Sequence, residues 1–113
     1  MRNRTSLSSE ILPGTLEVLI LKALTRDPAH GYAIARHIER VSDDMFRVGE
    51  SALYPALQRL LVNGWVKAEW GESELKRRAR IYRITPAGRK RLTQEAGEFA
   101  RVSGTINAIL RET

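Results

Sequence analysis

The spacing of the apolar residues changes twice along this chain, and these changes constrain the fold more than any other feature. Up to Asn63 the apolar residues recur every three or four positions, as on one face of an α-helix. From Trp65 to Trp70 they alternate with polar residues, as in a half-buried strand. After Thr85 the helical spacing returns and continues to Leu110. The sequence therefore predicts helices, then a small β element, then a long final helix.

Two short helices are predicted in the first part of the chain. The first follows Gly14, ends before Asp27, and has an apolar stripe of Leu16, Leu19, Ile20, Ala23 and Leu24. The second begins at His30 and places Ile34, Ile38 and Val41 on one stripe. His30 is expected to start this helix rather than to bind a ligand.

A third helix is predicted from about Ser51 to Asn63. Pro55 has no amide hydrogen and is tolerated only near the start of a helix, so Ser51 is the expected N-cap. Gly64 favours the C-terminal stop. The expected core stripe comprises Leu53, Leu57, Leu60 and Leu61.

The rest of the chain predicts a β-hairpin followed by one long helix. The strands are expected at residues 65–70 and 79–84, and the polar segment 71–78 forms the tip of a wing. Thr85 caps the last helix. The predicted fold is mainly α with a small β-hairpin (α+β): a winged helix-turn-helix with three helices, a two-stranded wing and a long C-terminal helix.

We expect three parts in this chain: a flexible arm at residues 1–10, a DNA-binding domain at 11–85 and a dimerisation helix at 86–113. The final helix carries an apolar stripe that has no partner left in so small a chain. A homodimer is therefore predicted through Leu92, Ala96, Phe99, Val102, Ile106, Ile109 and Leu110.

Basic residues are concentrated on the predicted wing and just after it. The formal net charge is +6, and no Asp or Glu interrupts the series Lys76, Arg77, Arg78, Arg80, Arg83, Arg89, Lys90 and Arg91. Arginine matches phosphate geometry, so this segment predicts contact with a nucleic-acid backbone. A solvated basic face is the alternative that charge alone leaves open.

The outer face of the third predicted helix indicates further contacts with nucleic acid. Opposite Leu53, its outer face presents Ser51, Gln58 and Arg59, with Tyr54 on the shoulder. Gln and Arg bond base edges in a major groove, and a hydroxyl bonds phosphate. The predicted contacts to double-stranded DNA are Ser51, Tyr54, Gln58, Arg59, Lys76, Arg77, Arg78 and Arg80.

Other classes of protein receive no support from the sequence. There is no cysteine, only two histidines and no catalytic or phosphate-binding motif, so neither an enzyme, a metal site nor a cofactor is expected. No apolar run is long enough for a signal peptide or a membrane span, which predicts a cytoplasmic protein without a membrane partner.

Several short motifs together resemble the PadR-type transcriptional regulators over about residues 12–92. They are His30-Gly31-Tyr32, Leu53-Tyr54-Pro55-Ala56-Leu57, Gly64-Trp65, Arg77-Arg78-Ala79-Arg80 before Tyr82, and Thr85-Pro86-Ala87-Gly88-Arg89. The resemblance implies a dimer held by the last helix, of the compact subgroup, that represses neighbouring genes, often for transport or detoxification. A twofold dimer in turn implies a near-palindromic operator.

This sequence departs from the family pattern at two places. Ser51 and Ala52 stand where members commonly have Gly followed by Ser or Thr, which puts a phosphate-contacting hydroxyl in doubt. Ile81 stands where a second aromatic is common.

Some relatives bind flat aromatic effectors in the dimer seam, near the position of Phe99.

Two other functions remain open from the sequence: a winged-helix module that binds protein, and a dimer that senses a small molecule. Trp65 and Trp70 are expected to pack under the wing rather than to form a plate for a drug. Tyr32 and Tyr82 are equally well explained as core aromatics or as functional residues.

Overall fold

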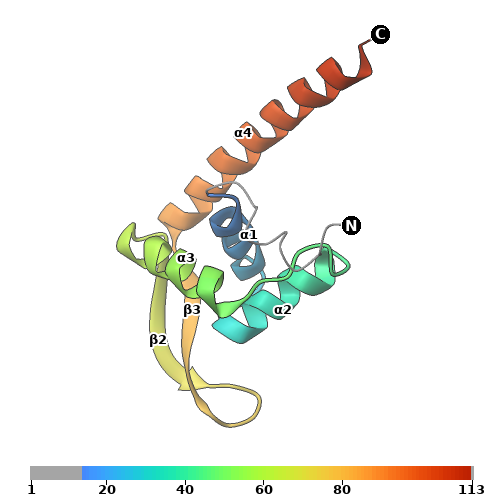
Figure 1. Cartoon of the computed structure of the whole chain (residues 1–113). Helices are drawn as coiled ribbons and strands as arrows, with labels where there is room; N and C mark the ends of the chain where they lie inside the picture. Colours follow the sequence, from blue (N-terminus) through green and yellow to red (C-terminus); the bar gives the residue numbers. More distant parts are fainter. Residues whose placement is uncertain (1–13, 113) are drawn as a thin grey trace.

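The structure is a computed structural model that describes residues 14–112, arranged as four helices and one three-stranded sheet (Figure 1). The elements are α1 (Thr15–Leu24), β1 (Ala29–His30), α2 (Gly31–Val41), α3 (Glu50–Val62), β2 (Val66–Glu72), β3 (Arg78–Ile84) and α4 (Pro86–Arg111). This order confirms the predicted winged helix-turn-helix with a long last helix. The predicted flexible arm at residues 1–10 lies outside the described residues.

Helix α1 lies at the centre of the fold and contacts α2, α3, α4 and β3. Ile20 and Leu21 are fully buried on it. The predicted stripe omitted Leu21 and included Leu19, which is only half-buried. Because several elements pack around α1, the buried part of its surface is wider than the stripe of a helix covered on one side.

Helix α2 begins as predicted, because His30 is its N-cap and the imidazole Nδ1 accepts a hydrogen bond from the Ala33 amide at 3.3 Å. Ile34 and Ile38 are buried, but the predicted burial of Val41 is wrong, since that side chain is 69% exposed. Val41 is the last residue of the helix and lies only at the rim of a shallow hollow over Phe46.

Helix α3 begins one residue earlier than predicted, and its N-cap is Gly49 rather than Ser51. The amides of Ala52 and Leu53 both donate to the Gly49 carbonyl, at 3.2 and 2.9 Å. Ser51 therefore lies inside the first turn, where its hydroxyl is not needed as a cap. Pro55 lies in the second turn and supplies no amide hydrogen to the Ser51 carbonyl.

The sheet has three strands in the order β1-β3-β2: β2 and β3 are the predicted two-stranded wing, and β1 was not predicted. Strand β1 pairs Ala29 with Tyr82 and His30 with Ile81. Two residues are too few to show alternation, which explains why the sequence did not reveal this strand. The wing strands are also longer than predicted, and only residues 73–77 form the tip.

A compact junction joins the sheet to α4. The Thr85 hydroxyl donates to the Gly64 carbonyl at 2.8 Å and accepts from the Gly88 amide at 3.0 Å, as the N-cap of α4. The Thr85 amide donates to the Trp65 carbonyl at 3.1 Å. The guanidinium of Arg91 lies 4.7 Å from the centre of the half-buried Trp65 ring. These contacts set the direction in which α4 leaves the body of the protein (Figure 1).

We predict that Gly88→Ala destabilises the protein strongly. A Cβ at Gly88 would lie 2.1 Å from the Trp65 carbonyl oxygen and 2.9 Å from an Ile84 carbon, so α4 would have to shift. The expected loss is about 2–4 kcal/mol in the free energy of unfolding, measured by urea denaturation.

Gly97→Ala is the matched control, because a Cβ there meets nothing within 4 Å and α4 continues on both sides. It should stabilise the chain by about 0.5–1 kcal/mol through helix propensity. Equal effects of the two substitutions would contradict the tight junction at Gly88.

Candidate nucleic-acid interface

The outward face of α3 carries the predicted polar side chains. Ser51, Tyr54, Gln58 and Arg59 are all exposed, while the Leu residues behind them are buried in the core. Pro55 is exposed on the same side. The structure thus places the helical half of the predicted site on one solvent-facing surface.

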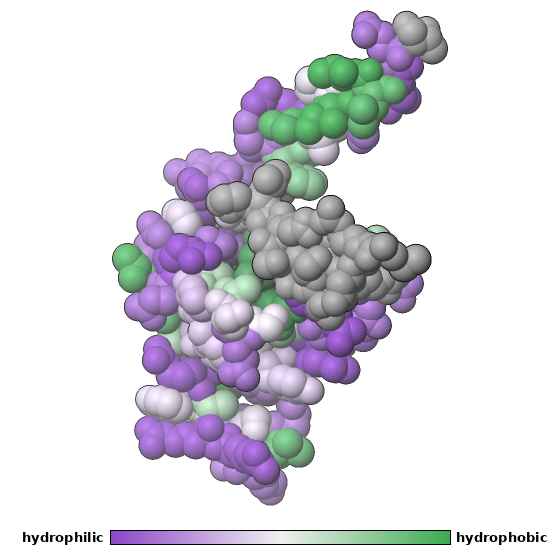
Figure 2. Space-filling model, in the orientation of Figure 1, coloured by the Kyte–Doolittle hydropathy of each residue, from purple (hydrophilic) through white to green (hydrophobic). Residues whose placement is uncertain are grey.

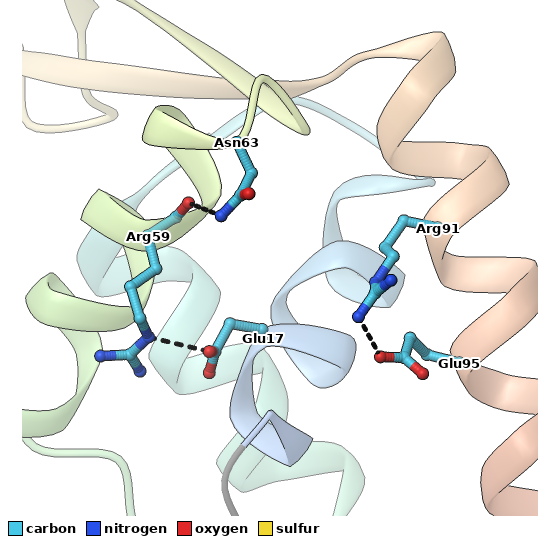
Figure 3. Close-up of polar contacts among 5 residues, drawn as sticks. All are labelled: Glu17, Arg59, Asn63, Arg91 and Glu95. Carbon is cyan, nitrogen blue, oxygen red and sulfur yellow. Dashed lines mark hydrogen bonds and ion pairs between the residues drawn. The ribbon is translucent and has the colours of Figure 1, made fainter.

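Arg59 is engaged by a neighbouring helix, which the sequence did not reveal. Its Nε donates to Glu17 Oε2 of α1 at 2.9 Å (Figure 3). This hydrogen bond raises the pKa of Arg59 above its ordinary value. Arg59 therefore connects α3 to α1, and any contact with a base would have to compete with Glu17 or use the remaining guanidinium N–H groups.

Tyr54 packs against the start of α2. A Cβ added at Gly31 would lie 3.0 Å from the Tyr54 hydroxyl oxygen and 3.2 Å from a ring carbon. A side chain at position 31 would push the ring away, so this close approach gives a physical reason for the Gly31 in the His30-Gly31-Tyr32 motif. The exposed Tyr32 lies elsewhere, with the Arg36 guanidinium 6.0 Å from its ring centre.

The strand register divides the wing into two faces. One face carries Arg78, Arg80 and Tyr82 of β3, opposite Glu72, Trp70 and Ala68 of β2. The other carries Ala79, Ile81 and Arg83, opposite Gly71, Glu69 and Lys67. The register therefore places Arg83 on the opposite face of the wing from Arg78 and Arg80.

The first face brings two guanidinium groups close to aromatic rings. The guanidinium carbon of Arg78 lies 4.4 Å from the Trp70 ring centre, and that of Arg80 lies 5.7 Å from it. Arg80 also lies 5.9 Å from the ring centre of Tyr82. Trp70 is 59% exposed, so the expectation that it packs under the wing is wrong, and its ring lies instead on the exposed face beside Arg78 and Arg80.

Acidic residues of β2 and the tip alter the charge pattern inferred from the basic series alone. Glu69 Oε1 lies 3.5 Å from Arg83 Nη2, and Glu74 Oε2 lies 3.7 Å from His30 Nε2. These carboxylates come from the facing strand and the tip, so the basic segment by itself did not reveal them. Arg83 is consequently a poorer candidate for phosphate contact than Arg78 or Arg80.

Tyr82 links the wing to α3. Its side chain is buried, and burial raises the pKa of the Tyr82 phenol, while the charge of Arg80 lowers it and nearby Tyr54 raises it. Tyr82 is thus close enough to both Arg80 and Tyr54 to be influenced by each. Because Tyr82 is buried, it connects the wing to α3 through the core and is not part of the solvent-facing surface.

Helix α4 carries an exposed apolar stripe away from the rest of the fold (Figure 2). Its exposed members are Phe99, Val102, Ile106, Ile109 and Leu110. Leu92 differs from the others in the predicted dimer stripe, because it packs partly against the core of its own chain. Ala96 lines a hollow of about 330 Å³ between α1 and α4, together with Val18 and Phe99.

Within residues 14–112, no group of three or more His, Cys, Asp or Glu residues is arranged to hold a metal ion. None of the helices described for this chain is both long enough and apolar enough to cross a membrane.

Comparisons with known proteins agree on one family. The profile described as "Transcriptional regulator PadR-like family" matches residues 20–94. A solved structure of a transcriptional regulator from Clostridium thermocellum is 32% identical, with a TM-score of 0.81 over 90% of this chain and 99% of that one. A PadR-like transcriptional regulator from Bacillus cereus is 25% identical, with a TM-score of 0.78 over 92% and 99% of the two chains.

A curated relative is much longer than this chain. It is a 37.1 kDa protein in a transposon of Streptomyces fradiae, 43% identical over 90 residues. The match covers 80% of this chain and 24% of the relative, so the chain spans about a quarter of that protein's length.

The raised pKa of Tyr82 predicts a loss of stability in alkaline solution. A folded pKa above the unfolded value means that the folded state retains this proton more strongly. The stabilisation is complete below the unfolded pKa, near 10, and is lost as the pH rises through the folded pKa.

Tyr82→Phe should remove this part of the pH dependence, because phenylalanine does not titrate. The measurement is the free energy of unfolding of both proteins from neutral pH to above the phenol range. Tyr32→Phe is the control, since Tyr32 is 66% exposed. Parallel curves for wild type and Tyr82→Phe would contradict the assignment.

Proposed function

Because the chain belongs to the PadR-like family of transcriptional regulators, we propose that it binds double-stranded DNA as a homodimer and represses genes next to its own. The family comparison confirms the prediction of a regulator rather than an enzyme. The observation that carries the proposal is the joint exposure of Gln58 on the outer face of α3 and of Arg78 and Arg80 on one face of the wing. Genes for transport or detoxification are the proposed targets.

The proposal divides the DNA contacts into two kinds. Ser51, Tyr54, Gln58 and Arg59 are assigned to the major groove and its edges, where Gln58 reads a base and Ser51 meets a phosphate. Lys76, Arg77, Arg78 and Arg80 are assigned to the phosphate backbone beside it. The exposure of Gln58 and the positions of Lys76 and Arg77 at the wing tip support this division.

The dimer is proposed to form through α4. The exposed apolar side chains from Phe99 to Leu110 form a stripe on a helix that projects from the body (Figure 2). A stripe of this kind is typical of a surface that a second chain covers. Twofold symmetry would then pair with a near-palindromic operator whose half-sites are separated by about 10 base pairs or a multiple of that.

A second candidate function is sensing of a small aromatic molecule by the same dimer. The hollow between α1 and α4 supports it, because Phe99, Val18 and Leu19 give it apolar walls beside the proposed seam. This function would add to DNA binding rather than replace it. The arginines on the wing favour DNA over a protein as the main partner.

Replacement of Phe99 and Ile106 by Asp should convert the dimer to monomers. Two carboxylates buried at the centre of the seam would be strongly unfavourable. Sedimentation velocity measures the change. The control is Gln94→Asp with Ala108→Asp, which adds the same charge to exposed positions on the opposite side of α4. A dimer that survives the first pair of substitutions would place the seam elsewhere.

Changing Arg77 and Arg78 to Ala should weaken binding to every DNA sequence, because contacts with phosphate do not depend on the bases. The log–log dependence of affinity on salt should also become shallower, by about 0.9 for each phosphate that the variant no longer neutralises.

Gln58→Ala should instead cost about 1–3 kcal/mol on the operator alone, if it removes a bidentate base contact. Both variants are measured against the duplex from upstream of the chain's own gene and against a scrambled duplex over a salt series. The proposal is wrong if the wing variant loses only upstream binding, or if Gln58→Ala weakens both duplexes equally.

A further inference from the structure

The arginines on the protein surface differ in what occupies their guanidinium groups. Arg59, Arg83 and Arg91 each lie against a carboxylate, respectively Glu17, Glu69 and Glu95. In the part of the chain that the structure describes, Arg78 and Arg80 form no ion pair and instead lie over the ring of Trp70. The two groups of arginines therefore have different capacities to bind an anion.

A guanidinium that stacks on an aromatic ring keeps its N–H donors. Stacking uses the flat π face of the group, whereas all five N–H bonds lie in its plane and point outward. A carboxylate occupies those N–H bonds, but Trp70 does not. Arg78 and Arg80 are thus restrained in position while their donors remain available for the paired oxygens of a phosphate.

The strand register explains how one ring holds two arginines. Trp70 is the direct cross-strand partner of Arg80. Arg78 is two residues along β3 on the same face, within reach of a large ring as a diagonal neighbour. The ring remains 59% exposed, so it adds little to the core, and the guanidinium groups of these two arginines both lie over it.

We propose that Trp70 is a positioning residue for DNA binding: its ring holds Arg78 and Arg80 in place, with their N–H groups free for the phosphate backbone. This inference rests on the proposed function. Its physical effect is to lower the conformational entropy that two long side chains lose on binding. Arg80 also has the Tyr82 ring at 5.9 Å, whereas Arg78 depends on Trp70 alone.

Trp70→Leu should lower the affinity for DNA about fivefold to thirtyfold, the amount that two exposed cation–π contacts supply. The loss should be equal for the upstream and scrambled duplexes, because phosphate contacts carry no sequence. The salt slope should stay unchanged, since the arginines still reach the backbone. Trp70→Phe, which keeps a smaller ring, should recover part of the affinity. Leu75→Ala, at an exposed apolar residue of the tip, is the matched control and should change nothing.

A double-mutant cycle separates positioning from direct contact. In a chain that already carries Arg78→Ala and Arg80→Ala, Trp70→Leu should have no further effect on affinity, because there is nothing left to position. A full additional loss in that background would mean that Trp70 itself touches DNA, and would overturn the proposal. An unchanged affinity of the single Trp70→Leu variant would overturn it too.

NMR of the DNA-free protein tests the stacking independently. Ring current from Trp70 should shift the δ protons of Arg78 and Arg80 upfield, and Trp70→Leu should remove this shift, more completely for Arg78. Failure of the wild-type chain to bind either duplex would reject the proposed function itself. Tight wild-type binding that Trp70→Leu leaves unchanged would reject only the role of Trp70.

Discussion

Three hydrogen bonds around Thr85 hold together the parts of this protein that have to act together. The hydroxyl bonds the Gly64 carbonyl at the end of α3, the amide bonds the Trp65 carbonyl at the start of the wing, and the same hydroxyl caps α4. Gly88 allows α4 to approach so closely that a methyl group would collide with the Trp65 backbone. The helix proposed for dimerisation thus starts at the junction where α3 ends and the wing begins.

In a twofold dimer, this junction would affect the distance between the two DNA-binding surfaces. If α4 meets its copy along the stripe from Phe99 to Leu110, the junction at Thr85 and Gly88 sets how far apart the two α3 helices lie. The spacing of operator half-sites would then depend on a contact that touches neither DNA nor the partner chain. The hollow beside Phe99 lies between α1 and α4, where a bound molecule would alter the same geometry.

The arginines show how tertiary contacts divide residues that look alike in a sequence. Arg59 and Arg78 were both predicted to contact DNA. Arg59 is bonded to Glu17 of α1, while Arg78 forms no ion pair among the described residues and lies 4.4 Å from the Trp70 ring centre. Charge alone would count the two as equal, but their surroundings assign them different capacities for binding phosphate.

The order and type of most elements could be predicted from local sequence patterns. Three features depend only on neighbours within a few residues, so they can be predicted from the sequence. They are the helical spacing, the end of α3 at Gly64 and the start of α4 at Thr85-Pro86. The outward face of α3 and the apolar stripe of α4 were predictable for the same reason. The Ser51 cap was wrong because Gly49 and Glu50 also suit the start of a helix, and local preference did not separate them.

Contacts between residues far apart in the sequence became visible only in the three-dimensional structure. Strand β1 has only two residues and forms because β3 lies beside it. Val41 is exposed because no other element covers the last turn of α2 among the described residues. The pairing of Arg59 with Glu17 joins residues 42 positions apart, and Trp70 reaches its arginines across the hairpin. Such contacts are set by packing and strand register, which the local spacing of residues does not encode.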